Sequence, residues 1–255
     1  MKRFLIYAML ILLVLFSFSA CSDTPQEEEL TVLSVSAAAS LTDALTDIAA
    51  LFESEHNVKI EFNFGSSGSL KTQILEGAPC DVFISASKSH MDALEEEDLL
   101  IEDTREDLIR NTLTLIASSE KMNDITLANL SEVDSIAIGE PESVPAGQYA
   151  FDALTSLGLW DGLESKVIYA KDVRAVLEYV DSGNVDCGVV YLTDAVLLKT
   201  GAVVENFPAD SHKPIVYPVA ALNEGDNQEM AVAFLEFLKT DDAKEILESY
   251  SFDVI

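Results

Sequence analysis

Serine residues stand at two junctions where an apolar, strand-like segment gives way to a helical pattern. At the first junction, AAASLTDAL, three alanines lead to Ser40 and then to an amphipathic run. At the second, FNFGSSGSL, a strand ending at Phe64 passes through a Gly/Ser turn into a helix. The first N–H groups of a helix have no acceptor within the helix, so they attract anions. The alternative at Ser40 is ordinary capping, because Asp43 completes an S-x-x-D signal. Two such junctions raise the odds of an anion site.

The same serines do not form a catalytic motif. The Gly/Ser turn lacks the G-K-[ST] ending of a phosphate-binding loop. It is not a G-x-S-x-G nucleophile elbow, because Ser69 occupies the last glycine position. No motif places a base beside either serine, so we expect a protein that is not an enzyme. A serine-dependent hydrolase remains the rival from a different functional class.

Two further helix starts and one tyrosine lie in the second half of the chain. Residues 145–147, Pro-Ala-Gly, precede a helical pattern, and Asp172 stands at the N-cap position of another. Tyr191 ends a strand-like run. Its ring belongs either to the core or to a cleft, and its strand-end position favours the cleft. Tyr217 is interpreted as a packing residue.

The elements that must position these residues alternate regularly between strands and helices. Strands are predicted at 31–36, 58–64, 81–85, 112–117, 135–138, 166–169, 188–192, 202–205 and 217–222. Helices are predicted at 41–56, 69–76, 89–96, 148–157, 173–181, 228–239 and 242–249. This alternation predicts an α/β fold with largely parallel sheets. Two stretches, NTLTLIASSE and SHKPIVYPVAALNEG, look like chain crossings. They predict lobe I from 31–111 plus 220–255, lobe II from 112–219, and a ligand cleft between the lobes.

The N-terminal segment has the pattern of an export signal. Two basic residues precede a short apolar stretch, and residues 18–21 read FSAC. This ending resembles the signal of bacterial lipoproteins, in which the cysteine is lipidated and begins the mature protein. The resemblance predicts a signal peptide at 1–20, lipidation of Cys21, a polar tether at 21–30 and anchoring to the cell membrane outside the cytoplasm. An ordinary signal peptide with an unrelated cysteine is the alternative.

Charge excludes one class of partner. The chain has 15 basic and 45 acidic residues, a formal net charge of −30. Nucleic-acid binding needs a basic face, so it is not expected. Cys80 and Cys187 show no CxxC spacing, and we interpret them as small buried residues rather than a redox or metal pair. No cofactor and no protein-bound metal ion are predicted.

Several motifs, taken in order, resemble the molybdate-binding proteins of bacterial molybdate ABC transporters. They are AAASLTDAL, FGSSGSL, GAPCDVFISAS, PESVPAGQYA, KDVRAVL, GVVYLTDA and FPADSHKPIVYPVA. The resemblance runs from about residue 31 to the C-terminus. It implies the two-lobed periplasmic binding protein type II fold, with an anion held between the lobes by neutral donors.

The resemblance also implies site residues and partners. The hydroxyl donors would be Ser40, Ser67 and Tyr191, and the backbone N–H donors would be Ala146 and Val173. Ser66 is the alternative to Ser67, because Gly68 makes the register of the turn ambiguous. Arg174 and Lys71 are expected to face solvent. The implied function is capture of molybdate, with tungstate, by a monomer that delivers the anion to a membrane permease. A receptor for another tetrahedral oxyanion such as sulfate is the alternative.

Overall fold

The computed structural model describes residues 30–255, and within them Thr31–Ile255 form one compact unit. The predicted signal peptide, Cys21 and all but the last residue of the predicted tether lie outside the described residues. Within residues 30–255, no helix combines the length and the apolar character needed to cross a bilayer.

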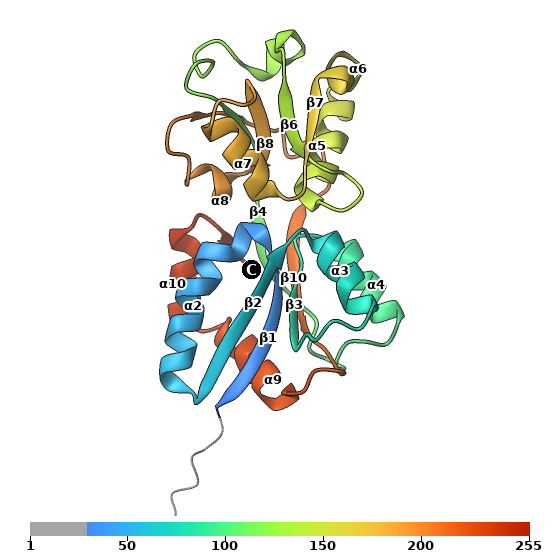
Figure 1. Cartoon of the computed structure of the whole chain (residues 1–255), viewed down its shortest axis with the longest axis vertical. Coiled ribbons are helices and arrows are strands. Elements are labelled where there is room, and N and C mark those ends of the chain that lie inside the picture. Colours follow the sequence, from blue (N-terminus) through green and yellow to red (C-terminus); the bar gives the residue numbers. More distant parts are fainter. Residues whose placement is uncertain (1–29) are drawn as a thin grey trace, which may run out of the picture. The chain divides into compact units, whose positions relative to one another are not determined.

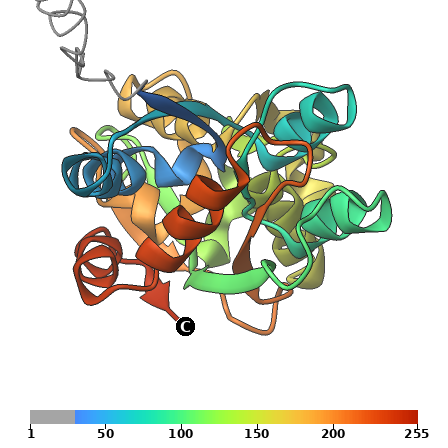
Figure 2. The same ribbon diagram turned by 90° about the horizontal axis from the view of Figure 1, so that it is seen from below.

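The first of two sheets in the described part has six strands in the order β11-β4-β10-β3-β1-β2. They are β1 (Thr31–Ala38), β2 (Val58–Gly65), β3 (Val82–Ile84), β4 (Glu106–Asn111), β10 (Ile215–Ala221) and β11 (Asp253–Val254). The helices α2 (Thr42–Glu55), α9 (Gln228–Phe237) and α10 (Asp241–Ser249) cover one face, and α3 (Ser67–Leu75) and α4 (Lys88–Glu96) cover the other (Figures 1 and 2). We call this sheet and its helices the first lobe.

The second sheet of the described residues has five strands in the order β7-β6-β8-β5-β9. They are β5 (Leu113–Ala117), β6 (Ile136–Gly139), β7 (Val167–Ala170), β8 (Cys187–Tyr191) and β9 (Ala202–Asn206). The helices α5 (Pro145–Ser156) and α7 (Val173–Asp181) lie on opposite faces (Figure 1). Shorter helices are α6 (Trp160–Leu163) and α8 (Leu192–Ala195), and 3-10 turns are η2 (Ala39–Leu41), η3 (Leu127–Glu132) and η4 (Glu164–Lys166). We call this part the second lobe.

Strand direction departs from the prediction of largely parallel sheets, because both sheets are mixed. β1 is parallel to β2 and β3, and β6 is parallel to β7 and β8. In contrast, β5 and β10 are antiparallel to their neighbours. These are the strands by which the chain enters each lobe after a crossing. A strand that enters a lobe from a crossing runs in the opposite direction to the strands whose ends lie beside that crossing. The two crossings therefore impose the antiparallel pairs.

The elements also differ from prediction in several places. β4 and β11 were not predicted, since β4 reads EDLIRN and β11 has two residues. Helices α3 and α5 begin earlier than the predicted 69 and 148. The predicted lobe border at 219/220 falls inside β10, all of which pairs within the first sheet.

Cys80 and Cys187 are buried, as interpreted from the sequence, and the structure shows that each is free. Trp160, the chain's sole tryptophan, packs edge-on against Phe151 of α5, with 4.7 Å between the ring centroids. Its environment therefore belongs to the second lobe.

Candidate functional site

A small cavity lies where strand ends and helix starts of the two lobes meet. The five residues proposed from the sequence, Ser40, Ser67, Ala146, Val173 and Tyr191, all line it. The cavity volume is about 10 Å³. A single water needs about 10–15 Å³ on the same measure, so the site is closely packed and admits only a small, compact ligand.

Ser40 lies in the 3-10 turn η2 between β1 and α2, and its side chain does not cap the helix. The capping interpretation was therefore wrong. Ser40 Oγ instead lies 2.9 Å from Tyr217 Oη, which accepts a hydrogen bond from Asn111 Nδ2 at 3.1 Å. Tyr217 is fully buried, so its O–H needs an acceptor, and Ser40 Oγ is that acceptor. The hydrogen of Ser40 is then left for a ligand.

The Gly/Ser turn separates its two serines by role. Ser66 is the N-cap of α3: it accepts from Ser69 N–H at 3.3 Å, and its hydroxyl donates to Ser69 Oγ at 2.8 Å. Ser67 is fully buried, and its Oγ accepts from Ala86 N–H at 2.9 Å. The hydroxyl hydrogen of Ser67 is free to donate, whereas that of Ser66 is already used. This distinction favours Ser67 as the ligand donor.

Backbone donors come from the first turns of α5 and α7. Ala146 and Val173 are the second and the first residues of these helices, so their N–H groups have no acceptor within the helix. Gly147 allows α5 to begin tightly against the end of β6, because a Cβ there would lie 2.0 Å from the carbonyl oxygen of Gly139. Asp172 lines the cavity, but its carboxylate caps α7 by accepting from Ala175 N–H at 2.8 Å.

Tyr191 closes the set of hydroxyl donors. It is 1% exposed at the end of β8, and its hydroxyl has no hydrogen-bond partner among residues 30–255. A buried unpaired hydroxyl costs about 1–3 kcal/mol, so a ligand acceptor would relieve this cost. Burial raises the pKa of Tyr191 well above its usual value, which keeps the hydroxyl protonated and able to donate.

The cavity is lined by hydrogen-bond donors and by one carboxylate, that of Asp172, which is engaged in capping α7. No Lys or Arg occurs among its lining residues within the described chain. The positive potential comes from helix starts and from oriented N–H and O–H groups. Such an arrangement binds an unprotonated anion and offers little to a ligand that must itself donate.

Sequence reasoning missed three supporting residues. Tyr217 was interpreted as packing, yet its hydroxyl orients Ser40. Asn111 lies on β4, which was not predicted, and nothing local marks it. Arg174 was expected to face solvent, but it is held between Asp43 and Asp194 at 2.8 and 2.6 Å. Arg174 lies within the motif KDVRAVL, which carries no signal for partners so distant in sequence.

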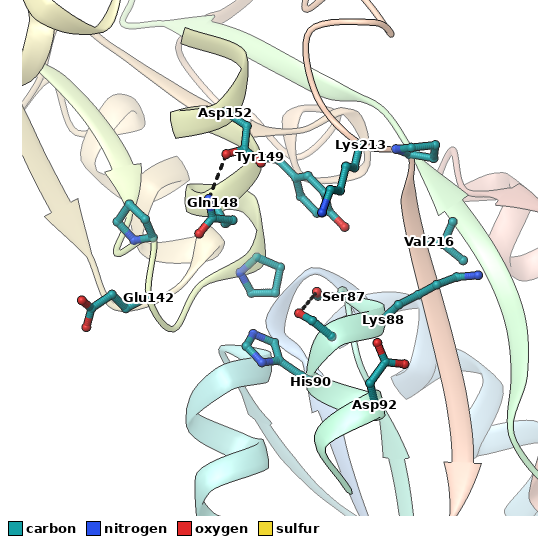
Figure 3. A pocket seen from close by; sticks show the side chains of 14 residues that line it. Ser87, Lys88, His90, Asp92, Glu142, Gln148, Tyr149, Asp152, Lys213 and Val216 are labelled. Carbon is teal, nitrogen blue, oxygen red and sulfur yellow. Dashed lines mark hydrogen bonds between the residues drawn. The ribbon is translucent and has the colours of Figure 1, made fainter. Parts of the chain in front are cut away.

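A wider groove of about 860 Å³ opens beside the cavity and shares Pro145 with it. Figure 3 shows Lys88 and His90 on α4 facing Gln148 and Tyr149 on α5, with Lys213 on the segment before β10. Acidic residues also line this groove, so it has no single charge preference.

Comparison with known proteins begins with one family model. The model of the bacterial extracellular solute-binding proteins matches residues 33–253. "Putative ABC transporter substrate-binding lipoprotein YvgL" of Bacillus subtilis (strain 168) is 41% identical over 243 residues, 94% of this chain and 93% of the relative. "Molybdate-binding protein ModA" of Escherichia coli (strain K12) is 41% identical over 229 residues, 87% of this chain and 89% of the relative.

Solved structures agree with this comparison. The substrate-binding domain of a putative molybdenum ABC transporter from Clostridium difficile has a TM-score of 0.69 at 43% identity, covering 88% of this chain and 99% of that chain. The periplasmic molybdate-binding protein of Azotobacter vinelandii has a TM-score of 0.78 at 25% identity, covering 86% and 98%. A sulfate-binding protein of Mycobacterium tuberculosis, at 15% identity and TM-score 0.77, shares the fold. The predicted fold class, a two-lobed periplasmic binding protein, is confirmed.

Proposed function

Because the chain belongs to the bacterial extracellular solute-binding protein family, we propose that it captures molybdate and delivers it to an ABC transporter permease. The observation that carries this proposal is the convergence of three hydroxyl donors and two helix-start N–H groups on one small cavity without a lining cation. Relatives that are 40% and 41% identical are named molybdate-binding proteins.

Selectivity should follow from fixed donors. Ser40, Ser67, Tyr191, Ala146 and Val173 stand on strand ends and helix starts that set the radius of the cavity. Tungstate has nearly the size of molybdate and should bind comparably. A smaller sulfate cannot reach every donor, and each buried donor left unpaired costs about 1–3 kcal/mol. Monohydrogen phosphate adds a proton that a donor site does not accept.

The test is calorimetry on residues 22–255 with molybdate, tungstate, sulfate and phosphate at one ionic strength. We expect tight and comparable binding of the first two. Sulfate should bind about a hundredfold more weakly or worse, since two unpaired donors suffice for this loss. Sulfate binding within tenfold of molybdate would instead favour the alternative, a general receptor for tetrahedral oxyanions.

The family consists of transport proteins, and we propose that this chain has no catalytic activity of its own. Ser40 and Ser67 are held by Tyr217 and by a backbone N–H, neither of which is a base. The rival hydrolase would turn over a generic ester or phosphoester, and no turnover above that of a Ser40→Ala/Ser67→Ala variant is expected.

Membrane anchoring and the lobe borders complete the proposal. The FSAC sequence supports lipidation of Cys21, and the relative from Bacillus subtilis is named a lipoprotein. Wild-type protein should incorporate a palmitate analogue and remain with the membrane, whereas Cys21→Ala should carry no label. We propose that lobe I comprises residues 31–111 together with the C-terminal part from β10 onward, and that lobe II comprises the segment between them. The second border then lies ahead of β10 rather than at 219/220. The protein should act as a monomer.

A further inference from the structure

One arginine joins the two lobes beside the cavity without lining it. Arg174 follows the site residue Val173 on α7 of the second lobe. It forms an ion pair with Asp194 of α8 at 2.6 Å, which lies in the same lobe. It also reaches the first lobe, where it lies 2.8 Å from Asp43 of α2 and donates to the Ser40 carbonyl oxygen at 3.2 Å.

The contacts of Arg174 fall into two groups, according to whether they would be lost if the lobes moved apart. The pair with Asp194 lies within the second lobe, so it persists whether the lobes are open or closed. The contacts with Asp43 and the Ser40 carbonyl cross between lobes, so they exist only when the lobes are together. One guanidinium thus has a permanent partner and two partners gained on closure, which its planar fork of donors permits.

The ion pair with Asp194 fixes the position of the Arg174 side chain before the lobes close. Asp194 is fully buried, whereas Arg174 and Asp43 have side chains that are 22% and 42% exposed. A guanidinium held on one side loses less conformational entropy when it gains a second partner. Its bond to the Ser40 carbonyl also fixes the turn that presents the Ser40 hydroxyl to the cavity.

We propose that Arg174 is a positioning residue that clasps the two lobes in the closed state and thereby slows release of the anion. The inference rests on the proposed function for the anion, although the clasp itself is a contact between lobes. Its expected signature is kinetic: loss of the interlobe contacts should speed dissociation and leave association almost unchanged.

The cleanest variant is Asp43→Asn, which removes the charge of one interlobe partner and leaves the buried pair intact. Glu55→Gln is the matched control, because it removes the same charge from an exposed position on the same helix. Arg174→Lys keeps a positive charge near Asp194 but loses the planar guanidinium, which can donate to several partners at once. Release of radiolabelled molybdate after a chase with unlabelled molybdate gives the dissociation rate.

We expect Asp43→Asn and Arg174→Lys each to raise the dissociation rate about threefold to fivefold, because each weakens an ion pair between partly exposed side chains that crosses between the lobes. The association rate should stay within about twofold. The double variant should be less than additive because both changes remove the same contact. Dissociation rates equal to those of wild type and Glu55→Gln would overturn the proposal.

A second measurement needs no ligand and separates this inference from the proposed function. Spin labels at Glu76→Cys and Asp161→Cys, exposed positions in the first and second lobes, report the distance between lobes. In ligand-free protein, Asp43→Asn should shift the distances toward the open state relative to Glu55→Gln. Identical distributions would count against the clasp even if molybdate proved not to be the ligand.

Discussion

A hydroxyl group has one hydrogen to donate, and its neighbours in the protein decide where that hydrogen goes. At Ser67 the oxygen accepts from Ala86 N–H. At Ser40 we assign the oxygen as the acceptor of the Tyr217 hydroxyl, because Asn111 Nδ2, the other neighbour of that hydroxyl, can only donate. At Ser66 the hydroxyl donates within its own turn. Ser66 and Ser67 are therefore neighbours in sequence, but only Ser67 has a hydroxyl hydrogen left to donate to a ligand.

Ser40→Ala and Ser67→Ala should each weaken molybdate binding by an order of magnitude or more. Each removes a hydrogen bond to a charged acceptor, worth about 1.5–3 kcal/mol. Ser66→Ala is the matched control and should cost stability of about 1 kcal/mol through the lost cap of α3, with a smaller effect on affinity. Calorimetry and thermal melting measure the two effects separately. Weaker binding in Ser66→Ala alone would show that the turn was assigned one residue off.

The carboxyl of Asp194 should make stability depend on pH. Burial raises its pKa from 3.8 to about 7, against the opposing effect of Arg174 and with Asp172 nearby. Between these two values the folded state holds a proton on Asp194 that the unfolded state has lost, so the ion pair with Arg174 is complete only above about pH 7, and the release experiments on that pair belong at pH 8. The free energy of unfolding should therefore fall as pH rises from about 4 to about 7 and level off above.

Asp194→Asn removes the titrating group and should flatten this part of the profile. Urea unfolding of both proteins at pH values across that window provides the measurement. An equal slope in wild type and Asp194→Asn would assign the dependence to other groups.

At the scale of elements, helix starts carry most of the donors that we propose for the ligand. α5 and α7 present N–H groups from one side of the cavity, while η2 and α3 present hydroxyls from the other. The first turn of α3 also touches the second lobe directly, because Gly68 N–H donates to the Ser143 carbonyl oxygen at 2.9 Å. A Cβ at Gly68 would lie 2.6 Å from that oxygen, a separation that real Cβ atoms essentially never show.

Gly68→Ala should therefore separate stability from binding. In the open state alanine fits the helix and favours it by up to about 1 kcal/mol over glycine. In the closed state its methyl collides with the backbone of Ser143. We expect an unchanged or higher melting temperature without ligand and molybdate affinity at least about tenfold lower.

Gln73→Ala, at an exposed position of the same helix, is the control and should leave affinity unchanged. Calorimetry measures the affinity for molybdate, and thermal melting of the ligand-free protein measures its stability. Normal affinity in Gly68→Ala would mean that the closed lobes do not require this close approach.

The sequence predicted elements better than it predicted connections between them. Apolar periodicity located β1 and α7 within a residue or two, because each buries one face whatever surrounds it. It missed β4, whose charged residues pair in the sheet only because β10 returns beside it. The five lining residues came from motifs, but Tyr217 and Asn111 act across more than 100 positions of sequence. Patterns within a short stretch of sequence cannot reveal contacts between residues that lie so far apart in the chain.

At the scale of the whole molecule, a dianion is expected to bind a protein with a formal net charge of −30. The donors act at contact distance, whereas the surface charges act through solvent. The Debye length falls from about 30 Å at 0.01 M to about 3 Å at 1 M salt. Repulsion should therefore slow the approach of the anion far more than it weakens the closed complex.

The association rate for molybdate should rise several-fold as potassium chloride increases over this range, with dissociation changing by less than about twofold. Rapid-mixing kinetics at each salt concentration measure both. Association that slows with salt would reveal a local positive field, for which Lys88 and Lys213 in the neighbouring groove are the available source.

Trp160 offers a way to observe the lobes one at a time. It packs on Phe151 within the second lobe and does not line the cavity. Its emission during heating therefore follows the melting of that lobe alone, whereas far-ultraviolet circular dichroism averages over both. Coincident curves would mean that the lobes melt as one cooperative unit. A gap between the curves, closing as ligand is added, would measure how strongly the bound anion couples the unfolding of the two halves.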